Sequence, residues 1–297
     1  MRYDHVGRDA SARRSSNKHG APGASRPTWN FKPYFALIGI RFLNGLQYRA
    51  AALAGLSTQF AWGFMILLGF RAFREANPAA FPMTETEMAA YIWLQQAFIA
   101  WLFIWFWEND IFADITSGNI AYELVRPVDL YSRWFAQVIG NRVARTVLRC
   151  LPILVVAAFL PGDLRLAAPP TWETAGLFTL SMILALGVVS SLGMLFYGAT
   201  VYSISAHGMR VIVPVLADFC AGAIVPLPFF PETLRRVMEL LPFATIQNVP
   251  LRIYSGHMAG AEAWQGIGLQ VFWLVVQLVL GRMLFRKALR KVVVQGG

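Results

Sequence analysis

Charged side chains are scarce in this sequence. Aspartate, glutamate, lysine and arginine make up 14% of its 297 residues, whereas a soluble globular domain carries about 25%. Hydrophobic residues account for 57% of the chain, and its mean hydropathy is +0.50. This composition excludes an ordinary soluble domain. The long runs without charge instead predict an all-α integral membrane protein.

Residues that catalyse reactions or bind metals are also few. The two cysteines, Cys150 and Cys220, lie far apart inside apolar runs, and the four histidines show no spacing typical of metal ligands. No serine lies in a nucleophile-elbow motif, and no glycine-rich loop ends in Gly-Lys-Ser or Gly-Lys-Thr. We therefore expect no enzymatic activity, no metal and no cofactor, and no ATP binding by the chain itself.

Six apolar runs have the length of a membrane span, since a helix needs about 20 residues to cross the hydrocarbon core. The spans are predicted at residues 50–70, 88–107, 138–160, 175–197, 211–230 and 264–281. The fifth run is irregular because it contains Pro214, Pro226 and Pro228. Between the last two spans, short helices are expected at 232–241 and 243–253, the second broken at Pro250.

The N-terminal part of the chain divides into two pieces. Residues 1–30 are polar, basic and without apolar periodicity, which predicts a disordered cytoplasmic tail. Over residues 31–49, aromatic and aliphatic side chains alternate with basic ones, which predicts an amphipathic helix lying in the membrane interface. The alternative is a longer first span with a basic flank. Residues 31–297 together are predicted to form one transmembrane domain.

The distribution of basic residues predicts the orientation in the membrane. With a cytoplasmic N-terminus, 20 of the 26 lysines and arginines fall on the inner side, as the positive-inside rule requires. Both termini are then cytoplasmic. The net charge of +10 is explained by this topology, so no nucleic-acid partner is needed. Arg235, Arg236 and Arg252 are exceptions on the outer side.

A polar segment, residues 108–137, separates the second and third predicted spans. It opens with three acids, Glu108, Asp110 and Asp114, and continues with the turn-forming residues 117–119. A short amphipathic piece follows at 120–125 and stops at Arg126-Pro127, because proline disfavours a helical conformation in the residue before it. Such a segment between spans is expected to dock a partner on the cytoplasmic side.

Charged residues inside the spans are candidate functional residues. Arg142, Arg145 and Arg149 are spaced to share one helical face. They either extend toward lipid headgroups or pair with the acids of the polar segment or with a partner protein. Asp218 is the one acid well inside a predicted span. Its carboxylate either belongs to a transport path or proton relay, or pairs with a neighbouring helix or subunit.

Two stretches carry a resemblance to a known family. DITSGNIAYELVRP at 114–127 is similar to the I-x-S-G-x-I-x-x-x-L-x-R-P motif of one bacterial branch of type-2 ATP-binding-cassette (ABC) exporters, in the permease subunit. LPFA at 241–244, P-x-RIYSG at 250–256 and VQGG at the C-terminus also match that branch. The resemblance extends over about residues 32–297. It implies six transmembrane helices, an interfacial helix and a coupling helix in the polar segment, in a bacterial inner membrane.

The resemblance also implies partners and roles. A separate cytoplasmic ATPase would bind ATP, and a second permease subunit, the same or related, would complete the path through the lipid. In the coupling helix, Ser117, Gly118 and Asn119 would form the turn, Ile120 and Leu124 the apolar contact, and Glu123 and Arg126 the charged contact, with Pro127 at the end. The family transports lipids, polysaccharides, peptides, drugs and ions, and no residue here selects among these substrates.

Three other readings of the sequence remain open at this point. A secondary transporter would use Asp218 as its proton or ion site and would need no ATPase. An integral-membrane enzyme acting on lipids would need clustered histidines or acids at one interface, and the acids that open the polar segment have no histidine near them. A passive anchor would have no need of the polar segment or of the irregular fifth span.

Overall fold

The computed structural model describes residues 32–47, 49–120, 123, 128–202 and 206–289, and the predicted tail lies outside them. These residues form helices and no strand. The α-helices are α1 (Lys32–Leu46), α2 (Arg49–Ala76), α3 (Glu85–Ala97), α4 (Ile99–Leu102), α5 (Asn109–Thr116), α7 (Leu130–Ala158), α8 (Trp172–Thr200), α9 (Ala206–Ala221), α10 (Glu232–Glu239), α11 (Pro242–Ile246), α12 (Asn248–Ser255) and α13 (Gly260–Leu289). Three short 3-10 helices are η1 (Pro78–Ala80), η2 (Gly162–Leu164) and η3 (Leu227–Phe229).

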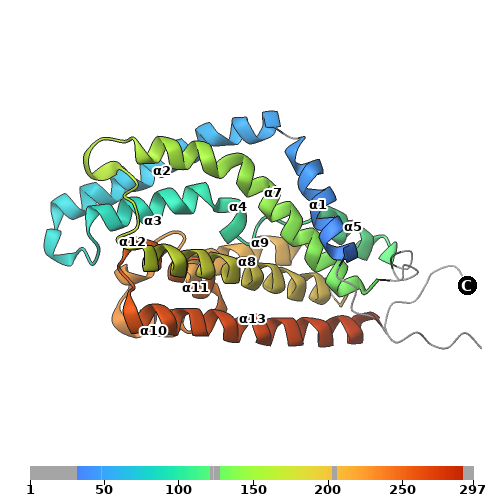
Figure 1. Ribbon diagram of the computed structural model, residues 1–297. Coiled ribbons are helices and arrows are strands. Elements are labelled where there is room, and N and C mark those ends of the chain that lie inside the picture. The colour runs from blue at the N-terminus through green and yellow to red at the C-terminus, as the bar shows by residue number, and fades with distance from the viewer. Residues whose placement is uncertain (1–31, 48, 121–122, 124–127, 203–205, 290–297) are drawn as a thin grey trace, which may run out of the picture.

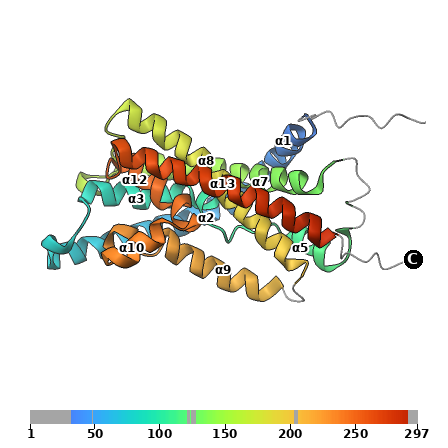
Figure 2. The same cartoon turned by 90° about the horizontal axis from the view of Figure 1, so that it is seen from below.

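The long helices lie side by side in an elongated bundle (Figure 1). One end of the bundle holds α5, the start of α7 and the end of α13, and is called the α5 end below. The opposite end holds α10, α12 and the start of α13. Helix α1 crosses α7 obliquely at the α5 end (Figure 2). The backbones approach closely there, because a Cβ atom at Gly140 would lie 3.1 Å from the Cα atom of Ile38.

Four long helices correspond to predicted spans: α2, α7, α8 and α13 have 28, 29, 29 and 30 residues. Helices α2, α8 and α13 cover their spans completely, whereas α7 ends at Ala158, two residues before the predicted end. At about 1.5 Å per residue they exceed the hydrocarbon core, which is about 30 Å thick. By length and apolar composition alone, α8 and α13 qualify as membrane-crossing helices within the described part of the chain. Much of α13 faces outward, with Phe272, Val275 and Val279 exposed.

The second predicted span is not one continuous helix. Helix α3 ends at Ala97, α4 ends at Leu102, and residues 103–107 are not helical. The prediction of a helix to residue 107 was therefore wrong at its C-terminal end. The cause lies in α7, where Arg142 donates to the carbonyl oxygens of Ala100 at 3.0 Å and Phe103 at 2.8 Å. With Arg142 as donor, these carbonyl oxygens no longer need the backbone N–H groups of a following helical turn.

The fifth predicted span is also shorter than expected. Helix α9 ends at Ala221, and Gly222 follows with a φ of 79° in the left-handed region, where glycine is favoured. Two side chains of α3 bind the freed carbonyl groups. Tyr91 donates to Gly222 O at 3.0 Å, and Gln95 donates to Ala223 O at 2.7 Å. Non-helical backbone at membrane depth is stable where protein groups satisfy it in this way.

The expected short helices after the fifth span are present as α10, α11 and α12. The predicted break at Pro250 was wrong, because the helices separate at Gln247. Pro250 instead lies in the first turn of α12, where its missing N–H has no intrahelical partner to lose.

Polar contacts fix the packing of the core. Thr84 and Glu87 form a capping box at the start of α3. Trp93 of the same helix is fully buried and donates to Leu164 O at 2.8 Å. Buried glutamines also join α8 to α13, since Ser181 donates to Gln270 at 2.9 Å and Ser191 to Gln277 at 2.7 Å.

Candidate functional site

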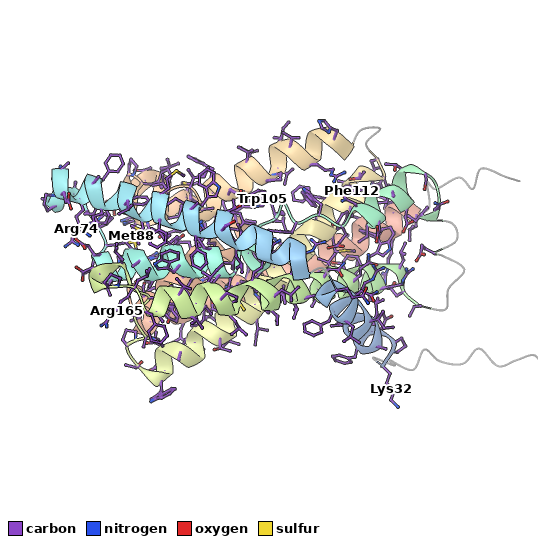
Figure 3. The ribbon with its side chains drawn as sticks, turned by 90° about the horizontal axis from the view of Figure 1, so that it is seen from above. Lys32, Arg74, Met88, Trp105, Phe112 and Arg165 are labelled. Carbon is purple, nitrogen blue, oxygen red and sulfur yellow. The ribbon has the colours of Figure 1, made fainter. Side chains whose placement is uncertain are left out.

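Helix α5, the first part of the polar segment, is anchored by two apolar side chains. Ile111 and Phe112 are buried, whereas Asp110 and Ala113 on the other face are exposed. The two buried side chains pack in a cluster built by α7, α8 and α13: Leu130, Tyr131, Trp134, Val138, Met194, Tyr197 and Phe285. Burying a side chain of this size contributes about 1.5–3 kcal/mol. Figure 3 shows Phe112 at the α5 end of the bundle.

The turn predicted after this helix lies at Ser117, Gly118 and Asn119. Ser117 Oγ donates to Ala113 O at 2.7 Å and accepts from the backbone N–H of Asn119 at 3.4 Å. Gly118 has a φ of 77°, a conformation that strongly favours glycine. All three residues are exposed, so the turn presents a polar surface at the tip of the α5 end.

The residues after the turn depart from their expected roles. Ile120 is 2% exposed and belongs to the same apolar cluster as Ile111. The expectation that Ile120 contacts a partner was therefore wrong: it anchors the turn to its own chain. Glu123 forms an ion pair with Arg133 of α7, so its charge is matched within the subunit. Leu124, Arg126 and Pro127 lie outside the described residues.

Glu108 joins the start of α5 to two long helices. Its backbone N–H donates to the hydroxyl of Tyr197 on α8 at 2.8 Å, and its Oε2 accepts from Asn141 Nδ2 on α7 at 2.5 Å. Its Oε1 lies 3.5 Å from Arg145 Nη2, an ion-pair distance without a hydrogen bond. Burial raises the pKa of this carboxyl above its usual range, and Arg145 and the Asn141 hydrogen bond counteract part of that rise.

The three arginines of α7 that the sequence singles out, Arg142, Arg145 and Arg149, make three different contacts. Arg142 is buried and binds the carbonyl groups at the end of α4, and Arg145 lies beside Glu108. The guanidinium of Arg149 lies against α2, where a Cβ atom at Gly55 would be 3.2 Å from its Cζ. Sequence spacing identifies the shared face, but it does not reveal that Arg142 binds backbone rather than headgroups or acids.

Two further contacts attach α5 to neighbouring helices. Arg41 of α1 lies 3.5 Å from Asp110. From α9, Arg210 donates to Asn109 and places its guanidinium 4.8 Å from the centre of the Phe112 ring, a cation–π distance. Sequence reasoning did not identify Arg41, Arg210, Tyr197 or Asn141. Helix α5 thus contacts α1, α7, α8 and α9 together, and a displacement of α5 acts on all four.

A sequence model of the family described as "ABC-2 family transporter protein" matches residues 60–296. The chain belongs to this family. It is a membrane subunit of an ABC transporter, a permease that lacks the ATPase domain, works with an ATPase subunit and needs no cofactor of its own. No curated protein matches the chain. The family match does not favour the alternatives of a secondary transporter, a lipid-modifying enzyme or a passive anchor.

Asp218 of the permease lies on a face of α9 that the chain itself leaves uncovered. The carboxyl group is half-buried, and the neighbouring Val215, Leu216 and Phe219 are exposed. Among the described residues, no ion pair or side-chain hydrogen bond involves Asp218.

The described part of the permease contains no group of three His, Cys, Asp or Glu side chains that could hold a metal ion. Cys150 and Cys220 are both free thiols. The candidate functional residues are those described above at the α5 end, together with Asp218 of α9.

Proposed function

We propose that α5 and the turn at residues 117–119 form the coupling element of an exporter permease, which binds a groove on the ATPase subunit. One observation carries this proposal: the exposed turn is braced on both sides by buried apolar residues, Phe112 before it and Ile120 after it. Because the turn is anchored on both sides, a force applied to it by the ATPase would displace α5 rather than unfold the turn. Leu124 and Arg126 would extend the contact beyond the turn.

The contacts of α5 support a path by which this force would reach the membrane-spanning helices. Movement of the coupling element reaches α7 through Glu108 and Asn141, α8 through Tyr197, and α9 through Arg210. These are the helices of the third, fourth and fifth spans. ATP-driven closure of the ATPase pair would tilt them together, which changes the side of the membrane to which the central path opens.

Orientation and assembly complete the proposal. The membrane would be a bacterial inner membrane, as the resemblance to a bacterial branch implies, and the bias of basic residues supports an orientation with the α5 end and both termini in the cytoplasm. A second permease subunit, the same or related, would cover the α9 face that carries Asp218. An ionised carboxylate at the bilayer centre costs about 2.5–3.5 kcal/mol on insertion scales. That cost favours a position of Asp218 on the shared transport path rather than against lipid.

The test introduces a charge into the exposed turn. The tagged permease is purified from its own cells in mild detergent as wild type and as Asn119→Arg. Co-purifying ATP hydrolysis is then measured. We expect the wild type to retain an ATPase and Asn119→Arg to lose most of it, because the new guanidinium disturbs the docking surface without touching a buried residue.

A matched control adds the same charge at the opposite end of the bundle. Thr233 lies exposed on α10, so Thr233→Arg is expected to keep the ATPase. The proposal fails if Asn119→Arg, correctly inserted, retains as much ATPase as Thr233→Arg. An ATPase that is lost from both variants would also contradict it, since the effect would then be independent of the turn.

A further inference from the structure

A pocket of about 470 Å³ lies at the opposite end of the bundle from the coupling element. Helices α10, α12 and α13 meet there (Figures 1 and 2). The volume is within the range of about 300–1,000 Å³ that small-molecule sites occupy. The family match and the coupling proposal assign no role to this pocket.

The walls of the pocket are mainly apolar. The apolar lining residues are Leu240 just after α10, Val249 of α12, Met258 in the loop before α13, and Leu269 of α13. Val249 and Met258 close against Gly266, where a Cβ atom would lie 2.9 Å from Val249 Cγ1. The pocket can therefore bury an apolar body of small-molecule size.

One buried polar side chain of the wall has no partner. Asn248 lines the pocket and is 1% exposed. Within the described residues, neither its Nδ2 nor its Oδ1 has a hydrogen-bond partner. A buried polar group without a partner costs about 1–3 kcal/mol. Asn248 therefore favours a ligand that offers an amine, amide or hydroxyl group, which can satisfy one or both amide atoms.

The charges around the pocket favour a cation. Glu239 and Glu262 both line it, and both pair at 2.9 Å with the guanidinium of the buried Arg252. Arg236, also in the wall, is already paired with Glu232. These five residues comprise three carboxylates and two guanidiniums, so the set carries one net negative charge. The Glu262 side chain is 52% exposed and can approach a ligand at the mouth.

We propose that this pocket binds a cationic amphiphile. The apolar body of the ligand packs against Val249 and Leu269, and a donor or acceptor group of the ligand forms a hydrogen bond with Asn248. The positive charge of the ligand lies near Glu262 and Glu239. The site is separate from the coupling element, so a ligand here binds without the ATPase.

Ethidium is a suitable probe because it is an aromatic cation with two amino groups. The permease is reconstituted without ATPase in phosphatidylcholine nanodiscs, and ethidium fluorescence is titrated against wild type, Asn248→Ala and Glu262→Gln. We expect saturable binding to wild type and affinity about tenfold lower in each variant, as for the loss of one hydrogen bond or one charge contact.

Two controls isolate the pocket. Glu75→Gln removes an equal charge from the exposed end of α2, which does not line the pocket, and is expected to bind ethidium as wild type does. The anion 8-anilinonaphthalene-1-sulfonate is expected to give the same signal with all four proteins. Thermal melting of each protein shows whether it is folded, and if Asn248→Ala does not fold, Glu262→Gln alone decides.

The proposal is overturned if folded Asn248→Ala and Glu262→Gln bind ethidium as tightly as wild type. It is also overturned if Glu75→Gln weakens binding as much as Glu262→Gln, since only overall charge would then matter. A lipid amine is one natural source of such a cation. Competition by phosphatidylethanolamine in the disc would identify a headgroup as the occupant, whereas competition by soluble amines alone would identify a free molecule.

Discussion

Arg142 donates a hydrogen bond of 2.8 Å to the carbonyl oxygen of Phe103, in the part of the chain where the second span stops being helical. The two residues are far apart in the sequence, and the arginine is almost fully buried. A long helix, α7, thereby fixes the point at which a neighbouring span turns toward the coupling element. The position of α5 depends on this contact, because residues 103–107 lead directly into Glu108.

Arg142→Leu should destabilise the permease. Hydrogen bonds to charged groups contribute about 1.5–3 kcal/mol, and the carbonyl oxygens of Ala100 and Phe103 would lose their donor. We expect a lower melting temperature in detergent and weaker binding of the ATPase. Arg286→Leu removes an equal charge from an exposed position near the end of α13 and should change neither. Equal effects of both substitutions would contradict a specific role of Arg142.

The stability of the wild type should depend on pH through Glu108. Burial raises the pKa of this carboxyl above 4.5, so the folded state binds more protons than the unfolded state between the two pKa values. Linkage then requires that stability falls as pH rises from about 4.5 through the raised pKa. Glu108→Gln removes this contribution. The difference in melting temperature between the two proteins should change across that range, and a constant difference would contradict the prediction.

Two glutamines of α13 should differ in importance. Gln270 accepts from Ser181 and donates to the carbonyl oxygens of Ser181 and Thr245, whereas Gln277 has one hydrogen bond, from Ser191. A hydrogen bond between membrane helices is worth about 0.6–2 kcal/mol. Gln270→Leu should therefore lower the free energy of unfolding more than Gln277→Leu, measured by denaturant titration in micelles. The reverse order would show that these bonds do not control the α8–α13 contact.

Two glycines of α2 provide a test of its packing on α3. A Cβ atom at Gly63 would lie 2.8 Å from the Trp93 ring, whereas at Gly69 nothing lies within 4 Å. Gly63→Ala should destabilise by about 1–3 kcal/mol because Trp93 is fully buried and cannot move freely. Gly69→Ala should be neutral or stabilise by up to about 1 kcal/mol through helix propensity. Comparable melting temperatures for the two variants would contradict the described contact.

The spans that could be predicted from sequence are those whose helices are continuous. Uncharged runs of span length identify α2, α8 and α13, and within the described residues α8 and α13 also qualify by helix length and apolar composition alone. The end of the second span could not be predicted, since the donor that satisfies its carbonyl groups belongs to another helix. The end of α9 was missed for the same reason, because Tyr91 and Gln95 of α3 hold the chain at Gly222 and Ala223.

The candidate site could be predicted in outline. The cluster Ser117-Gly118-Asn119 indicates a turn because these residue types favour one locally. The role of Ile120 could not be predicted from the sequence. An apolar residue in an amphipathic stretch is expected to be buried, but the pattern does not indicate whether its own chain or a partner buries it. Glu108 was recognised as an acid of the polar segment, but its three partners come from α7 and α8 and have no local pattern.

The burial of Ile120 has a consequence for the speed and specificity of assembly. A loop that orders only on contact loses conformational entropy at that moment, about 1–2 kcal/mol for each backbone residue that becomes fixed. The turn at 117–119 is held at both ends before any partner arrives, so little of that entropy remains to be lost. If the ATPase docks here as proposed, it would meet a turn that is already ordered, and Ile120→Ser should slow association while leaving every exposed residue of the turn unchanged.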